Sequence, residues 1–101
     1  MLLHSQGAPT LLGLCDLMAR VNKPVTKIHI PRSVFEKLKA DPQTQDVLRY
    51  PCEADENKAG SIYGTDIFIT EESRPLLTIE YATPTGPGRQ YALFSEKQND
   101  H

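Results

Sequence analysis

The chain has no tryptophan, only two cysteines and no long apolar run. Cys15 and Cys52 have no metal-binding spacing and are too few for a disulfide framework, so we expect two reduced thiols. No apolar run approaches the roughly 20 residues that a membrane-spanning helix needs. The apolar run before Cys15 also fails as a lipoprotein signal, because leucine stands where a small residue is required and no basic residue precedes the run. We therefore expect a protein without an export signal.

What the chain does contain is typical of one small globular domain. Of its 101 residues, 39% are apolar and 24% are charged, which excludes wholesale disorder. A chain of this length buries roughly two-thirds of its unfolded surface, so its core is small and docking onto a second copy or another protein would stabilise it. We expect a flexible arm over residues 1–8, a single domain over 9–95 and a disordered tail over 96–101.

The charges are distributed unevenly along the chain. Residues 1–50 carry seven basic and four acidic residues, a net charge of +3, whereas residues 51–101 carry four basic and nine acidic residues, a net charge of −5. A positive half joined to a negative half would suit complementary docking, including head-to-tail self-association. Folding can also intermingle the halves and remove the asymmetry, and the sequence leaves both outcomes open.

The first element is predicted to be a helix. Apolar residues recur at helical spacing from Leu11 to Val21, and Pro24 follows as a stop signal, which predicts a helix over residues 9–21. Alternation over residues 25–30 then predicts a short strand.

Two short helices are predicted next. Ser33 and Glu36 have the spacing of a capping box, in which each side chain satisfies an exposed backbone amide. Asp41 precedes a proline and is typical of a second helix start. We therefore expect a pair of helices meeting at a corner over residues 33–50.

The second half of the chain predicts strands. A polar, acidic loop over residues 52–60 is followed by apolar alternation over about 61–70, 76–83 and 90–94. The proline- and glycine-rich residues 84–88 predict a reversal, so the last two strands form a C-terminal hairpin. Helices ahead of a three-stranded antiparallel meander predict an α+β domain with the helices on one sheet face. The strand order stays open.

Several chemistries lack the residues that they need. The segment from Asp55 to Asp66 has part of the spacing of a calcium-binding loop, but Ala59 removes a ligand and aspartate replaces the final glutamate. Cys52, His29 and an aspartate could form a nucleophilic trio, but no motif for an activated nucleophile surrounds them.

The histidines and the glycine-rich turn predict no site either. His4, His29 and His101 are too far apart in the sequence for a metal site. Residues 85–89 lack the lysine, the serine or threonine and the helix of a phosphate-binding loop. We expect no catalytic, cofactor-binding or metal-binding residue, and no enzyme.

One basic segment has the charge that a nucleic-acid partner would require. Between Arg20 and Lys39 the chain carries six basic residues and one acidic residue, Glu36, which could neutralise several phosphates. However, the chain has no recognition helix and no base-stacking aromatic cluster, and its acidic half would repel DNA. We therefore favour protein over nucleic acid as the partner. Whether these basic residues form a patch after folding stays open.

Apolar residues on both sides of the predicted strands indicate a protein contact. One sheet face must pack against the helices, so the surplus on the other face favours a partner protein, the N-terminal helix of the same chain or a neighbouring copy. The pattern leaves open which of the candidates belong to the core. The candidate contact residues are Leu14, Leu17, Met18, Tyr63, Leu77, Ile79 and Tyr81.

Residues 28–70 contain three notable stretches, IPRSVFEKLK over 30–39, VLRY over 47–50 and IYGTDIFI over 62–69. Together these stretches resemble small uncharacterised proteins of tailed bacteriophages. In those proteins a helix with a Phe-Glu-x-Leu core precedes a loop and a strand that begins with an aromatic residue and glycine. Asp66 departs from the pattern, since those strands usually carry proline there.

The resemblance implies a phage protein that binds protein partners and has no chemistry of its own. We therefore expect a non-enzymatic interaction module in the virion or its assembly, located in the host cytoplasm or the particle. The alternative is a phage-encoded inhibitor that binds a host defence or nucleic-acid-processing protein through its acidic half. The partner and the oligomeric state stay open.

Overall fold

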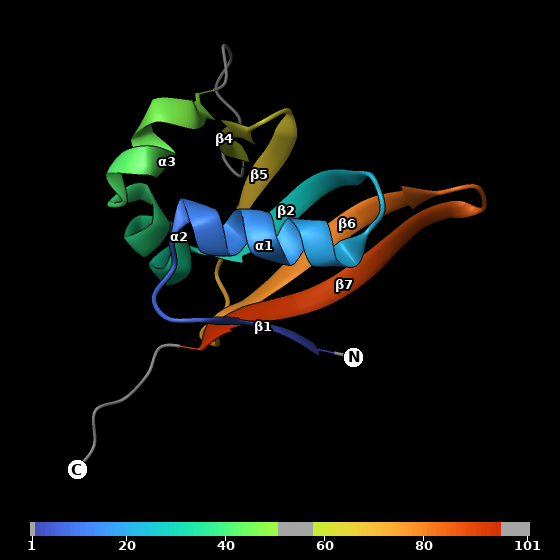
Figure 1. Ribbon diagram of the computed structural model, residues 1–101, viewed down its shortest axis with the longest axis horizontal. Coiled ribbons are helices and arrows are strands. Elements are labelled where there is room, and N and C mark those ends of the chain that lie inside the picture. Colours follow the sequence, from blue (N-terminus) through green and yellow to red (C-terminus); the bar gives the residue numbers. More distant parts are fainter. Residues whose placement is uncertain (1, 51–57, 96–101) are drawn as a thin grey trace.

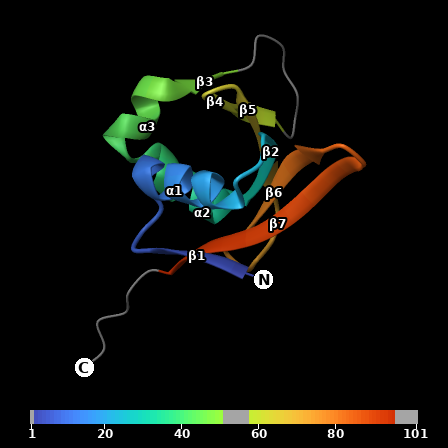
Figure 2. The ribbon, with the colours of Figure 1, turned by 45° about the vertical axis from the view of Figure 1, so that its right-hand side comes forward.

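The computed structural model describes residues 2–50 and 58–95, which form seven strands and three helices. The strands are β1 (Leu2–Gln6), β2 (Val25–Pro31), β3 (Leu48–Arg49), β4 (Lys58–Ile62), β5 (Thr65–Thr70), β6 (Leu76–Thr83) and β7 (Gly86–Ser95). The helices are α1 (Leu11–Val21), α2 (Arg32–Lys39) and α3 (Pro42–Val47). All three helices lie on the same side of the sheet (Figure 1). Figure 2 shows the sheet curving around them.

The strands form one mixed sheet in the order β1-β7-β6-β2-β5-β4-β3. β1 is parallel to β7 and β2 is parallel to β5, whereas the other neighbours are antiparallel. The predicted three-stranded antiparallel meander is therefore wrong. β2 lies between β5 and β6 and separates two strands that are consecutive in the sequence. Alternation within a strand shows which side chains share a face, but it carries no information about which strand lies beside it.

The single strand predicted over 61–70 is also wrong, because a hairpin turn divides it. Tyr63 and Gly64 both have positive φ, at 52° and 80°. Positive φ at both central residues is the geometry of a two-residue type I′ turn, whose twist matches that of the strands it joins. β4 and β5 therefore pair as a hairpin, with Ile62 opposite Thr65.

Residues 2–6 belong to the predicted flexible arm over 1–8, but they form the edge strand β1 beside β7. Its Ser5 side chain is buried under α1. A Cβ atom at Gly13 would lie 2.9 Å from both the Phe94 ring and Ser5 Oγ. Glycine inside α1 therefore lets the helix approach β1 and β7 closely, which explains a residue that otherwise weakens a helix by about 1 kcal/mol.

α1 covers one half of the sheet and ends at Val21, as predicted. Thr10 Oγ1 accepts a hydrogen bond from the Gly13 amide at 3.1 Å, and Asn22 ends the helix in the left-handed conformation, at φ 58°. The buried stripe of α1 consists of Leu11, Leu14, Leu17 and Val21. No helix in the described ranges is long and apolar enough to cross a membrane.

α2 and α3 form the predicted helix pair, but the predicted capping box is wrong. α2 begins at Arg32, so Ser33 lies inside its first turn and no side chain caps the helix. Asp41 does cap α3, where it accepts a hydrogen bond from the Gln43 amide. Its other oxygen accepts from the Leu11 amide at 2.9 Å, so a single carboxylate joins the starts of α3 and α1.

The C-terminal hairpin is longer than predicted, because β6 and β7 pair from Leu76–Leu93 to Thr83–Gly86. Only residues 84–85 lie between the two strands. Tyr81 pairs with Gly88, where any Cβ would lie 2.4 Å from the tyrosine ring. Glycine at this position therefore makes room for the aromatic ring.

The core lies between the helices and the inner face of the sheet. Helix and strand side chains with no exposed surface meet there, among them Leu14, Leu17, Ile28, Ile30, Leu38, Ile62, Ile67, Leu77 and Ile79. Because the strand residues among them occupy alternate positions, the intervening side chains must point to the other side of the sheet.

Candidate functional site

The side of the sheet that faces away from the helices, here called the open face, carries two rows of paired side chains. Both rows cross the same four adjacent strands, β7, β6, β2 and β5. The aromatic row consists of Tyr91, Thr78, His29 and Phe68. The charged row consists of Arg89, Glu80, Lys27 and Asp66.

The aromatic row is held by contacts around His29. The His29 and Phe68 rings stack with centroids 5.5 Å apart and planes 24° apart, and Lys27 Nζ lies 5.6 Å from the Phe68 centroid. His29 Nε2 lies 2.6 Å from Glu80 Oε2, and the Glu80 side chain is only 17% exposed. Since the two side chains are fixed against each other, the centre of the open face is preorganised for contact.

The charged row alternates in sign across the four strands. Arg89 is opposite Glu80, Glu80 is opposite Lys27, and Lys27 is opposite Asp66. Lys58 Nζ also lies 3.3 Å from Asp66 Oδ1. Opposite charges in cross-strand pairs stabilise a sheet, so this alternation supports the fold as well as shaping the surface.

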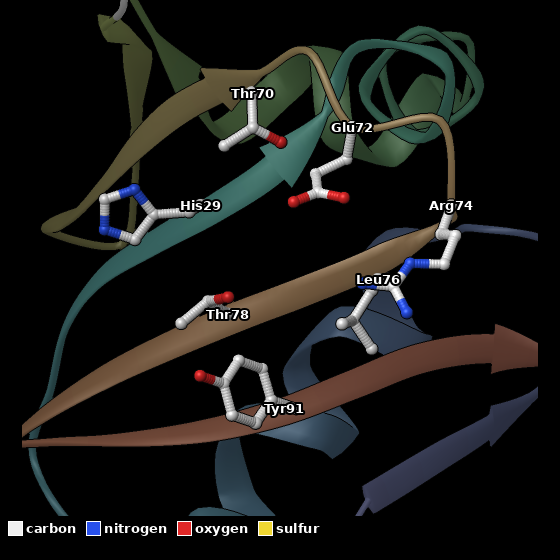
Figure 3. Close-up of a pocket in the computed structure, with 7 residues that line it drawn as sticks. All are labelled: His29, Thr70, Glu72, Arg74, Leu76, Thr78 and Tyr91. Atoms are coloured by element: carbon white, nitrogen blue, oxygen red, sulfur yellow. The ribbon is translucent and has the colours of Figure 1, made fainter.

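A shallow hollow of about 380 Å³ adjoins the aromatic row. It lies over β2, β6 and β7 and beneath the connection between β5 and β6 (Figure 3). Its polar side chains come from four separate segments, with apolar contact from Leu76. The lining residues are His29, Thr70, Glu72, Arg74, Leu76, Thr78 and Tyr91.

Three features of the described ranges bear on possible chemistry. Glu80 orients His29 as a carboxylate orients a general base, but no serine, threonine or cysteine side chain of this part of the chain is hydrogen-bonded to the imidazole. Burial raises the pKa of the Cys15 thiol, which disfavours the reactive thiolate. No group of three or more metal-ligating residues occurs in the same ranges.

The structure places the sequence-predicted contact residues in three environments. Leu14, Leu17, Leu77 and Ile79 have no exposed surface and belong to the core. Met18 and Tyr81 are partly buried and pack against the core. Tyr63 is 65% exposed at the tip of the β4–β5 hairpin. Only Tyr63 therefore offers most of its side chain to a partner.

Two rejected chemistries fall partly outside the described residues. Cys52, the nucleophile of the trio, lies there, and so does Asp55, the first residue of the calcium-like loop. The described end of that loop, from Gly60 to Asp66, belongs to the β4–β5 hairpin. The predicted tail over 96–101 also lies outside the described residues.

Three basic residues of the segment from Arg20 to Lys39 lie next to acidic side chains, and one of those acidic side chains comes from the negative half of the chain. Within the basic segment from Arg20 to Lys39, Arg20 bonds Asp16, Lys39 approaches Glu36, and Arg32 bonds Glu71 at 2.7 Å. The hydrogen bond and charge of Arg32 lower the pKa of Glu71, and those of Glu71 raise the pKa of Arg32. Arg20, Arg32 and Lys39 are thus each paired with an acidic side chain.

Sequence reasoning missed the residues of the open face. His29, Glu80 and Tyr91 were assigned to strands, but the rows they form depend on strand order and register. The only sequence signal was the polar or aromatic character of alternate strand positions. That signal marks a face without showing which side chains lie next to each other.

Compared with known proteins, the chain matches no family model, no curated protein and no solved structure. The resemblance of residues 28–70 to phage proteins therefore stays a prediction from the sequence.

Proposed function

We propose that this chain is a non-catalytic protein-binding module that contacts its partner through the open face. The proposal is carried by one observation: in residues 2–50 and 58–95 the helices cover only one side of the sheet, while the other side presents the aromatic row with its His29–Phe68 stack. Tyr91 is 45% exposed, and the His29–Phe68 stack lies in the same row, separated from it by Thr78. Exposed aromatic side chains on a rigid scaffold are typical of protein contacts.

In-cell photo-crosslinking tests this proposal. A photo-reactive phenylalanine analogue at position 91 lies on the open face, and the same analogue at Leu12, which is 70% exposed on α1, provides a matched control. In cells of the source organism we expect a covalent adduct to protein from position 91 and little from position 12. No adduct from position 91, or equal yields from the two positions, would contradict the proposal.

The proposed setting is the virion or its assembly, and it rests on the phage resemblance of residues 28–70. Particles purified from a lysate should then contain the chain at a fixed copy number, measurable by quantitative mass spectrometry. The alternative, an inhibitor acting through an acidic half, needs a continuous acidic surface. Because Lys27 and Arg89 alternate with Glu80 and Asp66, we give that alternative second place.

A further inference from the structure

The geometry points to a second copy of this chain as the partner of the open face, an inference that rests on the proposed function. The carrying observation is the sign pattern of the charged row. Read from β7 to β5, the charges of Arg89, Glu80, Lys27 and Asp66 run plus, minus, plus, minus. Read in reverse, the same row runs minus, plus, minus, plus, so the row is complementary to its own reversed copy.

A two-fold axis produces this reversal. Two sheets packed face to face lie about 10 Å apart. If the axis runs parallel to the strands and passes between β6 and β2, each row faces its own reversed copy. Arg89 then faces the second copy's Asp66, and Glu80 faces the second copy's Lys27. All four facing pairs have opposite charges, and a two-fold dimer is the commonest symmetric assembly.

The same axis also pairs the aromatic row with itself. Tyr91 faces the second copy's Phe68, and Thr78 faces the second copy's His29, because these residues hold corresponding places in their row. Aromatic rings would therefore meet near the charged pairs. The same two-fold rotation makes both rows complementary to their copies, which is the property expected of an isologous interface.

The size of the surface predicts a weak dimer. Four strands about 4.8 Å apart, with about 3.3 Å per residue along each strand, give a contact patch of roughly 300 Å² per copy. Stable interfaces bury about 800 Å² per partner. The curvature of the sheet around the helices also keeps its outer strands away from the second copy (Figure 2). We therefore expect association that depends on protein concentration and weakens with salt, since Lys27 and Arg89, which supply the positive charge of every facing pair, are exposed to solvent.

Complementary charge reversals test the arrangement in solution. Lys27→Glu places two like-charged pairs in the dimer, because the introduced carboxylate would face Glu80 of the second copy, and Glu80→Lys does the same with positive charges. Each variant alone should self-associate about tenfold more weakly than the wild type. An equimolar mixture should recover dimers, because every facing pair is again of opposite sign. Sedimentation equilibrium at low salt and at 1 M salt, where the Debye length is about 3 Å, measures all four samples.

The mixture separates effects between copies from effects within one chain. Lys27 and Glu80 are also cross-strand neighbours, so each single variant disturbs its own sheet, but mixing repairs only contacts between copies. Lys37→Glu and Asp46→Lys, on the exposed surface of α2 and α3, are the matched controls and should leave association unchanged. If either open-face variant loses its circular dichroism spectrum, Arg89→Glu mixed with Asp66→Lys repeats the test at the ends of the row.

The outcomes distinguish this inference from the proposed function. A wild type that stays monomeric throughout, or variants whose mixture does not recover dimers, would overturn self-pairing. If position 91 nevertheless crosslinks to a different protein, the open face is a docking site for that protein and the proposed function stands. If position 91 crosslinks to nothing, both fail.

Discussion

The two faces of the sheet differ in the chemistry of their side chains, although the same strands supply both. In β6, Leu77 and Ile79 have no exposed surface, while Thr78 and Glu80, at the alternate positions, lie on the open face. The helix-covered face is aliphatic and is held by close packing. The open face is mainly aromatic and charged and is held by specific pairs such as His29–Glu80. Counting apolar strand residues therefore overestimated the surface left for a partner, because most of the aliphatic ones face the helices.

The largest expected effect is a difference in stability between variants of two adjacent leucines, one on each face of the sheet. Leu77→Ala removes a side chain with no exposed surface, whereas Leu76→Ala removes the same atoms from a half-buried side chain at the hollow. We expect Leu77→Ala to lower the free energy of unfolding by about 2–5 kcal/mol. Leu76→Ala should lower it by about 1 kcal/mol or less. Urea unfolding of both variants measures the difference, and equal losses would mean that the open face is covered in solution.

A smaller effect, in the opposite direction, is expected at the β4–β5 turn. Tyr63 has φ 52°, a conformation that asparagine adopts far more readily than tyrosine, and its exposed side chain loses little packing when replaced. Tyr63→Asn should raise the free energy of unfolding by about 0.5–1 kcal/mol. Thermal unfolding followed by circular dichroism would show this gain. A loss of stability would indicate that the tyrosine ring contributes packing that outweighs its strained backbone.

The smallest expected effect concerns the surface pair Arg32–Glu71, which links α2 to the β5–β6 connection. The pKa of Glu71 is lowered in the folded state by the hydrogen bond and charge of Arg32. Its contribution to stability is therefore present above the ordinary glutamate pKa and is lost as the pH falls through the lower, folded-state pKa. Glu71→Gln should slightly lower the urea midpoint at neutral pH and should match the wild type in acid. A difference that persisted in acid would exclude the ion pair as its cause.

Local chemistry explains the predictions that hold. α1 ends at Val21, as its apolar stripe and the following stop signal predict. Asp41 caps α3, as its place before a proline predicts. In both cases residues within a few positions of each other decide the conformation, through helix spacing or a single capping hydrogen bond.

The missed features depend on residues far apart in the chain. β1 has no periodic pattern, and it becomes a strand because β7 lies beside it. Glu80 reaches His29 only because β2 lies between β5 and β6. The β4–β5 turn was a nearer miss, since Gly64 is a local turn signal, but tyrosine in the left-handed conformation is uncommon.

By itself, the sequence determined the helices, the alternation of most strands and the absence of recognisable catalytic motifs, because these follow from spacing along the chain. Only the tertiary structure decided the strand order, and with it which charges face which. Cross-strand neighbours are set by pairing energies summed over whole strands, and a change of one residue in register would move every side chain to the opposite face. The open face, and its charged row that is complementary to its own reversed copy, therefore depend on the tertiary structure alone.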